Sequence, residues 1–395
     1  MLLSRRSALT GFVLFVLIGV VASSFGPIVP SFRSTFHVSA ATAGLLLSGH
    51  FAGAVLGVLS PVLVPARHQS PRLMTFISIC LLAAGCLVIG AAPGWPVAAG
   101  AAVVEGAGWG TLVIIFNTLF ASGFGARSAA VLTLLNAVFG LGSILGPASV
   151  GLIFQGNYRP PFITAGLIAF VLLPLAFTLP VAATSVPRAE KEVRSTGLPL
   201  LLAFFMAAFF LLGGLEAGIG AWEPTHLIFT GLSAASAGTV ASFFWMTYTA
   251  GRLGAATLSL RVGPERIVLA AVASTGILLG LTRITAITAA AYTLCGFAAA
   301  PLFPLSVIWA TKALAMTPRT TSLVVATDLF GGVILNTALG RLITSTSAAS
   351  LPFAFAVMAA VCLAILLAIP AVGRLQSAAG RLAQTEEAPS GRGEA

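Results

Sequence analysis

The sequence predicts an all-α membrane protein in which twelve transmembrane helices form two pseudo-symmetric six-helix bundles. Of the 395 residues, 58% are hydrophobic and only 8% are charged, whereas soluble globular domains carry about 25% charged residues. Long apolar stretches recur along the chain, and the second half repeats features of the first. This composition excludes a soluble enzyme, and it also excludes a disordered chain, which would combine low hydrophobicity with high charge.

The apolar stretches have the length of membrane spans, because a helix of about 20 residues crosses a hydrocarbon core of about 30 Å. The first run, after Arg5 and Arg6, resembles a signal peptide but continues to Pro30, so we expect it to be an uncleaved span. Proline or glycine marks most of the short connections, as at 93–96 and 159–161. The predicted spans are 8–31, 40–64, 73–92, 97–121, 128–153, 161–181, 198–222, 234–258, 266–282, 285–311, 321–344 and 351–371.

The predicted organisation is an N-terminal bundle (1–181), a linker (182–197), a C-terminal bundle (198–375) and a polar tail (376–395). An even number of spans places both termini on one side. Of the 20 Lys and Arg residues, sixteen fall on that side, and the four on the other side are Arg33, Arg159, Arg283 and Arg341. Because positive charge is retained in the cytoplasm, we expect the termini, the linker and the tail to be cytoplasmic.

Other classes of function have no support in the sequence. The net charge is +10, but the basic residues stand singly between apolar stretches, so no nucleic-acid partner is expected. Neither Lys191 nor Lys312 follows the glycine of a phosphate-binding loop, and no protease or hydrolase motif occurs. We therefore expect no enzyme activity and no ATP-driven pump. No metal or cofactor is expected either, because the cysteines lie in apolar stretches without metal-ligand spacing: Cys80, Cys86, Cys295 and Cys362.

The two halves repeat at an offset of 194 residues. Residues 39–44 (Ser-Ala-Ala-Thr-Ala-Gly) match 233–238 (Ser-Ala-Ala-Ser-Ala-Gly). The same offset pairs Gly19 with Gly213, Gly26 with Gly220, Pro30 with Pro224, Arg67 with Arg261, Arg72 with Arg266 and Gly146 with Gly340. Parallel halves of this kind are typical of carriers that work by alternating access.

Several motifs resemble one transporter family. They are Gly-Gly-Leu-Glu-Ala-Gly-Ile-Gly-Ala-Trp at 213–222, Ala-Gly-Arg-Leu-Gly at 250–254 with Arg-Val-Gly-Pro-Glu-Arg at 261–266, Gly-Ala-Gly-Trp-Gly at 106–110 followed by Asn117, and the glycine-rich segment 139–147. With these, the chain resembles the major facilitator superfamily and, within it, the fucose-permease-like sugar:cation symporters.

The resemblance implies a secondary transporter for a small polar solute such as a sugar or another hydroxylated metabolite, with H⁺ as the coupling ion. It also implies a monomer surrounded by membrane lipid in the bacterial cytoplasmic (inner) membrane. Two departures bear on coupling: the loop 57–72 lacks the superfamily's acidic residue, and Val113 stands where fucose permeases carry a carboxylate. The Gly142–Pro147 motif also occurs in proton-coupled drug antiporters. An efflux antiporter on the same fold therefore stays open, as does a non-transporting membrane receptor.

Candidate site residues are polar groups at membrane depth, where an ionisable side chain is costly and therefore points to function. Glu216, in a glycine-rich helix, is the leading carboxylate for substrate or proton, and Glu105 is the next. His50 is a possible proton sensor or a hydrogen-bonded packing residue. Asn117, Asn136 and Asn336 are expected either to hydrogen-bond hydroxyl groups of the ligand or to hold helices together. Trp109, Trp222 and Trp245 are expected to stack on a sugar ring, and the alternative role of Trp222 is an interfacial anchor.

The expected gate uses basic residues at the cytoplasmic ends of the helices. We expect Arg67, Arg72, Arg261 and Arg266 to stabilise the outward-facing state, or simply to enforce topology. Asp328 is expected to serve as a gate residue or to pair with Arg127 or Arg252. Since Glu265 and Asp328 are the acidic partners within reach, the second-half arginines should matter more than the first-half pair.

Overall fold

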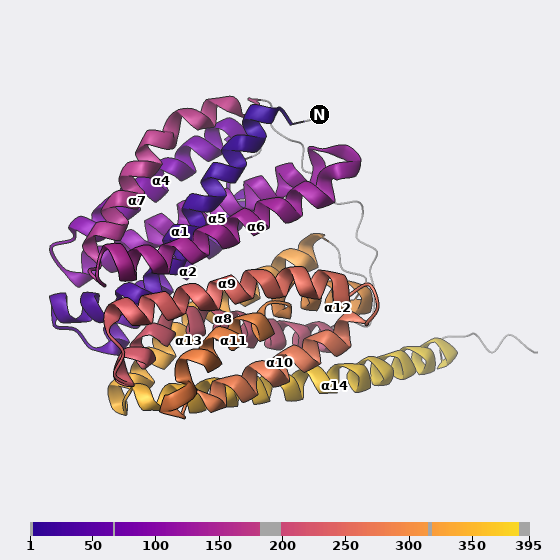
Figure 1. Ribbon diagram of the computed structural model, residues 1–395. Coiled ribbons are helices and arrows are strands. Elements are labelled where there is room, and N and C mark those ends of the chain that lie inside the picture. Colours follow the sequence, from indigo (N-terminus) through magenta and orange to yellow (C-terminus); the bar gives the residue numbers. More distant parts are fainter. Residues whose placement is uncertain (1–2, 66–67, 182–198, 315–317, 387–395) are drawn as a thin grey trace, which may run out of the picture.

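The computed structural model describes residues 3–65, 68–181, 199–314 and 318–386 (Figure 1). In this part of the chain every regular element is a helix. The predicted linker and Arg67 lie outside the described residues. The first half comprises α1 (Arg5–Phe36), α2 (Ala40–Val58), α3 (Ser60–Leu63), α4 (Pro71–Ala91), α5 (Trp95–Ser122), η2 (Gly125–Arg127), α6 (Ser128–Ala148), η3 (Ser149–Ile153), α7 (Arg159–Leu172) and η4 (Leu173–Thr178). The second half comprises α8 (Pro199–Phe229), α9 (Ala234–Leu258), α10 (Pro264–Leu281), η5 (Thr285–Ile287), α11 (Thr288–Ala299), α12 (Leu302–Leu314), α13 (Pro318–Ser345), η6 (Ala348–Ser350) and α14 (Leu351–Glu386).

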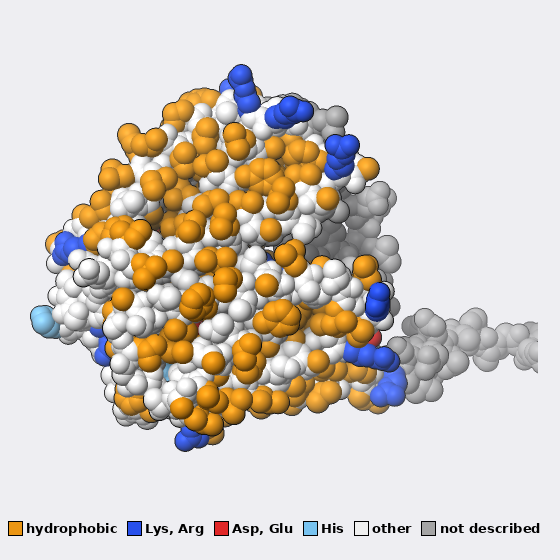
Figure 2. All heavy atoms as spheres, viewed as in Figure 1, with side chains coloured by type: hydrophobic (Ala, Val, Ile, Leu, Met, Phe, Trp, Pro, Cys, Tyr) orange, Lys and Arg blue, Asp and Glu red, His pale blue; other side chains and the backbone are white. Residues whose placement is uncertain are grey.

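The helices form two bundles, one above the other in Figure 1, as the sequence predicted. Within the described ranges, eleven helical segments are long and apolar enough to cross a membrane. The 25-residue helix α9, which is richer in Ser and Thr, completes the set of twelve. Hydrophobic side chains cover the face of both bundles, and the Lys and Arg side chains in view lie at its rim (Figure 2). A surface of this kind suits a lipid surround.

The predicted repeat is visible in how the helices begin. The Ser39 hydroxyl accepts a hydrogen bond from the Thr42 N–H at 3.2 Å at the start of α2. The Ser233 hydroxyl accepts one from the Ser236 N–H at 3.1 Å at the start of α9. Both are N-caps that satisfy a backbone donor in the first turn of the helix. The same local sequence therefore starts the second helix of each half.

The offset of 194 fails in the fifth helix of each half. A Cβ on Gly340 of α13 would meet Ala40, and the first-half residue with the matching contact is Gly151, whose Cβ would meet Ala235. Gly146, the partner predicted from the sequence, packs instead on Ser23 and Val20. The structural offset here is 189 (340 minus 151), so the pairing of Gly146 with Gly340 was wrong. Insertions between the helices shift the register, and only the packing reveals this.

The predicted spans also differ from the helices in detail. Helix α14 continues to Glu386, so much of the expected polar tail is helical. The tenth span is interrupted at 300–301, between α11 and α12. Pro301 and Pro304 explain the break, because proline donates no backbone hydrogen bond and its ring clashes with the preceding turn. The fifth span ends in the π-helical turn η3 just after Pro147.

The two bundles approach closely at the end that the predicted topology places outside. Glycine Cα atoms permit this approach: a Cβ on Gly26 of α1 would collide with the Gly220 carbonyl of α8, and one on Gly238 of α9 would meet Gly151. The Ala41 N–H donates to Thr344 Oγ1 at 2.9 Å across the same seam. Toward the other end the bundles spread apart in Figure 1. The structure is therefore closed at the predicted outer end.

Candidate functional site

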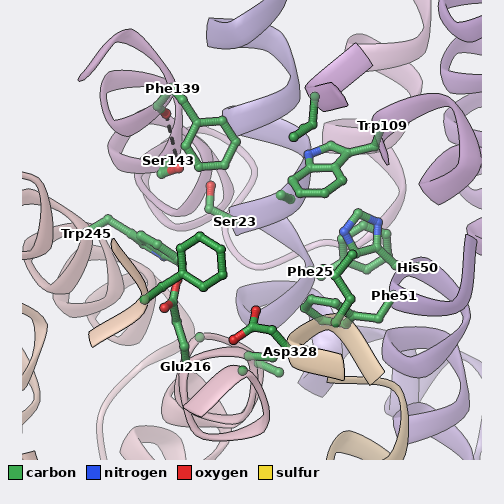
Figure 3. A pocket seen from close by; sticks show the side chains of 18 of the residues that line it. Ser23, Phe25, His50, Phe51, Trp109, Phe139, Ser143, Glu216, Trp245 and Asp328 are labelled. Atoms are coloured by element: carbon green, nitrogen blue, oxygen red, sulfur yellow. Dashed lines mark hydrogen bonds between the residues drawn. The ribbon is translucent and has the colours of Figure 1, made fainter. Parts of the chain in front are cut away.

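A cavity of about 280 Å³ lies between the bundles, lined by α1, α2, α5 and α6 of the first half and by α8, α9, α12 and α13 of the second. Figure 3 shows its labelled side chains converging on one space from both halves. A site in this position can exchange a ligand with one side and then the other if the halves rock about it.

Aromatic rings form much of the lining. Trp109 of α5 is fixed because its indole N–H donates to the Ile18 carbonyl at 3.0 Å. Its ring lies edge-on to Phe139 and to His50, with centroids 6.3 Å and 5.4 Å away. The full aromatic set is Phe15, Phe25, Phe51, Trp109, Phe139, Trp245 and Phe303. Such rings bind apolar or flat parts of a ligand with little loss of side-chain entropy.

The charged groups of the cavity come from the second half. Glu216 of α8 and Asp328 of α13 both reach it (Figure 3), and their carboxylates interact electrostatically. A Cβ on Gly213 would collide with Asp328, so this glycine brings α8 and α13 together at the two acids. Two carboxyl groups that face one apolar space can bind a proton or a positively polarised group of a solute.

Arg252 of α9 completes this group. Its Nη2 donates to the Tyr248 hydroxyl at 2.9 Å, and its guanidinium carbon lies 4.7 Å from the centre of the Tyr248 ring. Glu216 interacts electrostatically with both residues. A pair with Arg252 was one of the roles expected for Asp328, but Arg252 instead contacts Tyr248, and the ion pair found at the cavity is between His50 and Glu105. Stacking on Tyr248, one helical turn away, holds the guanidinium on α9.

His50 and Glu105 form a pair in the first half. His50 Nδ1 lies 2.6 Å from Glu105 Oε2, and both side chains are buried. His50 lines the cavity, where its ring lies against Phe25 with centroids 4.8 Å apart, whereas Glu105 lies behind it. Sequence reasoning selected both residues but missed their pairing. The glycines on the facing helices allow it, since a Cβ on Gly106 would collide with the His50 carbonyl.

Two predicted asparagines line the cavity, and one does not. The amides of Asn117 and Asn136 donate to the carbonyls of Val113 at 2.8 Å and Leu132 at 3.0 Å in their own helices. The Asn136 amide also lies 3.5 Å from Asn117 Oδ1. Asn336 is fully buried at the closed outer seam, where its backbone meets Gly44.

Trp222 also lies away from the cavity. It is fully buried beside Gly340, so neither an interfacial anchor nor a stacking platform describes its place. Trp109 and Trp245 do reach the cavity, as a ring-stacking role requires.

Three of the predicted gating arginines, Arg72, Arg261 and Arg266, lie within the described residues, and no contact joins Arg72 to the other two. Arg72 Nε donates to the Leu179 carbonyl at 3.0 Å within its own half, and Arg261 and Arg266 are exposed. Asp328, predicted as a gate residue, instead lies in the cavity beside Glu216. Because the bundles spread apart at the predicted cytoplasmic end, a role of these arginines in closing that end would belong to the opposite conformation.

Sequence reasoning missed most of the lining. Ser23 and Ser143 reach the cavity with hydroxyls that donate to carbonyls one turn earlier in their own helices. The five phenylalanines were also missed, because the chain has 27 and nothing in the sequence distinguishes those that face the cavity. Tyr248 carried a usable signal, since it stands four residues before Arg252 on one helix face.

Comparisons with known proteins agree with this arrangement. Residues 11–279 match the family model described as Major Facilitator Superfamily. The MFS-type transporter SLC18B1 of Mus musculus is 27% identical over 190 residues, which are 47% of this chain and 35% of that protein. The alignment therefore spans about a third of that relative's length.

Solved structures share the fold at low sequence identity. The nucleoside transporter NupG superposes with a TM-score of 0.71 at 14% identity, covering 93% of this chain and 98% of that one. The D-xylose-proton symporter gives 0.74 at 14% identity, covering 92% and 96%. A bacterial homologue of the human lysosomal transporter Spinster, in an inward-facing and unoccupied conformation, gives 0.71 at 12% identity, covering 95% and 98%.

Proposed function

The chain belongs to the major facilitator superfamily, and on this premise we propose that it is a secondary active transporter that moves a small organic solute by alternating access. The observation that carries the proposal is the cavity between the two bundles, which receives acidic groups from one half and the His50–Glu105 pair from the other. The glycine seam closes it at the predicted outer end. We further propose a monomer in the bacterial cytoplasmic membrane with both termini in the cytoplasm, as the distribution of basic residues indicates.

The lining supports an amphipathic solute. Trp109, Trp245 and the phenylalanines offer faces for a ring, while Glu216 and Asp328 accept hydrogen bonds from hydroxyl or amino groups. The resemblance of the sequence motifs implied a sugar or a similar hydroxylated metabolite as the solute. The aromatic lining narrows this to a molecule that carries a flat or apolar part beside its polar end. A plain hexose would leave most of these rings without a partner.

Proton coupling is proposed on the same residues. A solute with hydroxyl or amino groups and a proton would compete for the Glu216 and Asp328 carboxylates, which links release of one to binding of the other. His50 is proposed as a second site for H⁺, because its ring lines the cavity and its Nδ1 lies 2.6 Å from Glu105 Oε2. Competition of this kind couples proton entry to solute export, which is antiport, whereas uptake by symport would need the solute to bind to the protonated carboxyl groups. The aromatic lining favours export as the second candidate function.

A ligand-binding experiment tests the solute class. Purified protein is heated with a nucleoside, its free base, its free sugar and an aryl amine, since a ligand of the native state raises the melting temperature. We expect stabilisation by the compounds that join a ring to polar groups, and loss of that stabilisation in Glu216→Gln. Stabilisation by free sugars alone, or an undiminished effect in Glu216→Gln, would contradict the proposed solute class.

A further inference from the structure

A second group of buried titratable side chains lies outside the cavity, near the outer end of α8. Glu223 is 0% exposed, and His226 and Tyr292 beside it are also buried. His226 Nδ1 and the Tyr292 hydroxyl of α11 are 3.0 Å apart. Glu223 interacts electrostatically with Tyr292 and with Cys295. None of these four residues lines the cavity, so the group is separate from the transport site.

The Glu223 carboxyl is buried without compensation. Neither of its oxygens has a hydrogen-bond partner among the described residues. The neighbouring parts of α13 and α14 contribute Leu339 and Phe355, which pack at Gly218 one turn earlier on α8. Arg341, the nearest basic residue of α13 in this region, is exposed. An ionised carboxylate is strongly unfavourable in such surroundings, so we expect the carboxyl group to carry a proton in this conformation.

The repeat shows that the fold does not need these groups. At the offset of 194, which holds for α1 and α8, Glu223 corresponds to Val29 and His226 to Phe32. Both first-half residues are fully buried. Apolar side chains therefore fill the same place in the other half, and the carboxyl group of the second half is an addition to the packing.

The position of Glu223 connects it to the outer seam. Three residues earlier on α8, Gly220 meets Gly26, and the adjacent Trp222 packs beside Gly340 where that residue meets Ala40. Pro224 follows directly and removes a backbone donor from the helix, which weakens it at this point. If the seam opens, we expect the outer segment of α8 to lose its contact with α1 at Gly26 and to move relative to α11, which would expose Glu223 to water.

We propose that Glu223 is a proton-binding site, distinct from the cavity, that takes up one proton from the outer solution when the outer seam closes and returns it when the seam opens. Closure would therefore be favoured by acid on the outer side, whatever solute the cavity holds. The inference rests on the alternating-access part of the proposed function and on neither the solute class nor coupling through Glu216.

Spin labels on Ser34 and Ser345, both exposed at the outer ends of α1 and α13, measure closure by the distance between them. Cys80 is replaced by Ala, and the three remaining cysteines are buried. One proton taken up on closure changes the closed-to-open ratio by up to about tenfold per pH unit. We expect the unsubstituted Glu223 protein to close as the pH falls, and Glu223→Gln, which copies the neutral carboxyl, to stay closed at high pH.

Glu223→Val places the side chain of the first-half counterpart, Val29, at this position. Its outer seam should also stay closed at high pH, which would show that the result for Glu223→Gln does not come from the new amide group. Glu216→Gln is the control for titration within the cavity. The double variant Glu216→Gln/Glu223→Gln should lose the pH dependence of the closed-to-open ratio that Glu216→Gln alone retains. A Glu223→Gln profile identical to that of the parent, or two neutral variants that are both more open, would overturn the proton site while leaving alternating access intact. A label distance that never changes would overturn both.

Discussion

Replacing Gly26 by alanine should open the outer seam. The new Cβ would fall on the Gly220 carbonyl oxygen and lie 3.1 Å from its carbon and 3.3 Å from the Ala221 Cα. All three neighbours are backbone atoms, so α1 and α8 must separate by about 1 Å to restore normal contact. Alanine also favours a helix over glycine, so the fold itself is not weakened by the substitution.

The size of the effect follows from the cost of such overpacking, about 1–3 kcal/mol. At about 1.4 kcal/mol per tenfold change in an equilibrium constant, the closed-to-open ratio should fall roughly 5- to 150-fold. The spin-label distance between positions 34 and 345 measures this ratio, and a population at longer distance should appear.

Gly220→Ala is the matched control, although Gly220 faces Gly26. A Cβ on Gly220 would point toward Trp245 at 3.3 Å, a side chain that can rotate away. Gly100→Ala, with nothing within 4 Å of its Cβ, controls for helix propensity. The reasoning fails if Gly26→Ala leaves the distance unchanged, or if Gly100→Ala opens the seam equally.

Three further predictions concern the site and the topology. In proteoliposomes, Glu216→Gln should reduce the solute accumulation driven by a pH gradient at least about tenfold, while solute exchange continues. An unchanged rate and pH profile would show that the role of Glu216 is structural. His50→Phe leaves the buried Glu105 without its partner and should destabilise the protein by about 3 kcal/mol; thermal unfolding should show partial recovery when Glu105→Gln is added, and no recovery would argue against the pair. Cysteines at Ser122 and Ser34 should react with an impermeant reagent from the cytoplasmic and the outer side respectively, and labelling of both from one side would contradict the topology.

The fold was predictable because composition and repetition determine it. Few charges, spans of bilayer length and the capping serines at 39 and 233 are enough to indicate twelve helices in two halves. Boundaries were less accurate where helices continue past the apolar stretch, as α14 does beyond residue 371. The repeat register in the fifth helix also needed the packing of Gly151 and Gly340, because insertions between helices leave no mark in a glycine-rich sequence.

The candidate site was predictable only where a residue was rare. Glu216, His50 and Asp328 stand out as ionisable groups at membrane depth, and all three reach the cavity. Glu105 satisfied the same criterion and Trp222 was selected as a residue that could stack on a ring, but both face other parts of the interior. Because lipid and protein interior are both apolar, hydrophobicity does not show which face of a membrane helix points inward. For the same reason the sequence could not distinguish the cavity phenylalanines from those that face lipid.

Two label pairs measured on one sample test alternating access most directly. The outer pair is Ser34 with Ser345, and the inner pair is Ser122 with Leu260, which is 85% exposed at the predicted cytoplasmic end of the second half. The account predicts opposite changes: Gly26→Ala should lengthen the outer distance and shorten the inner one, because one rocking motion about the cavity links both ends. If both distances lengthen together, the two halves open a continuous path, and the protein does not work by alternating access.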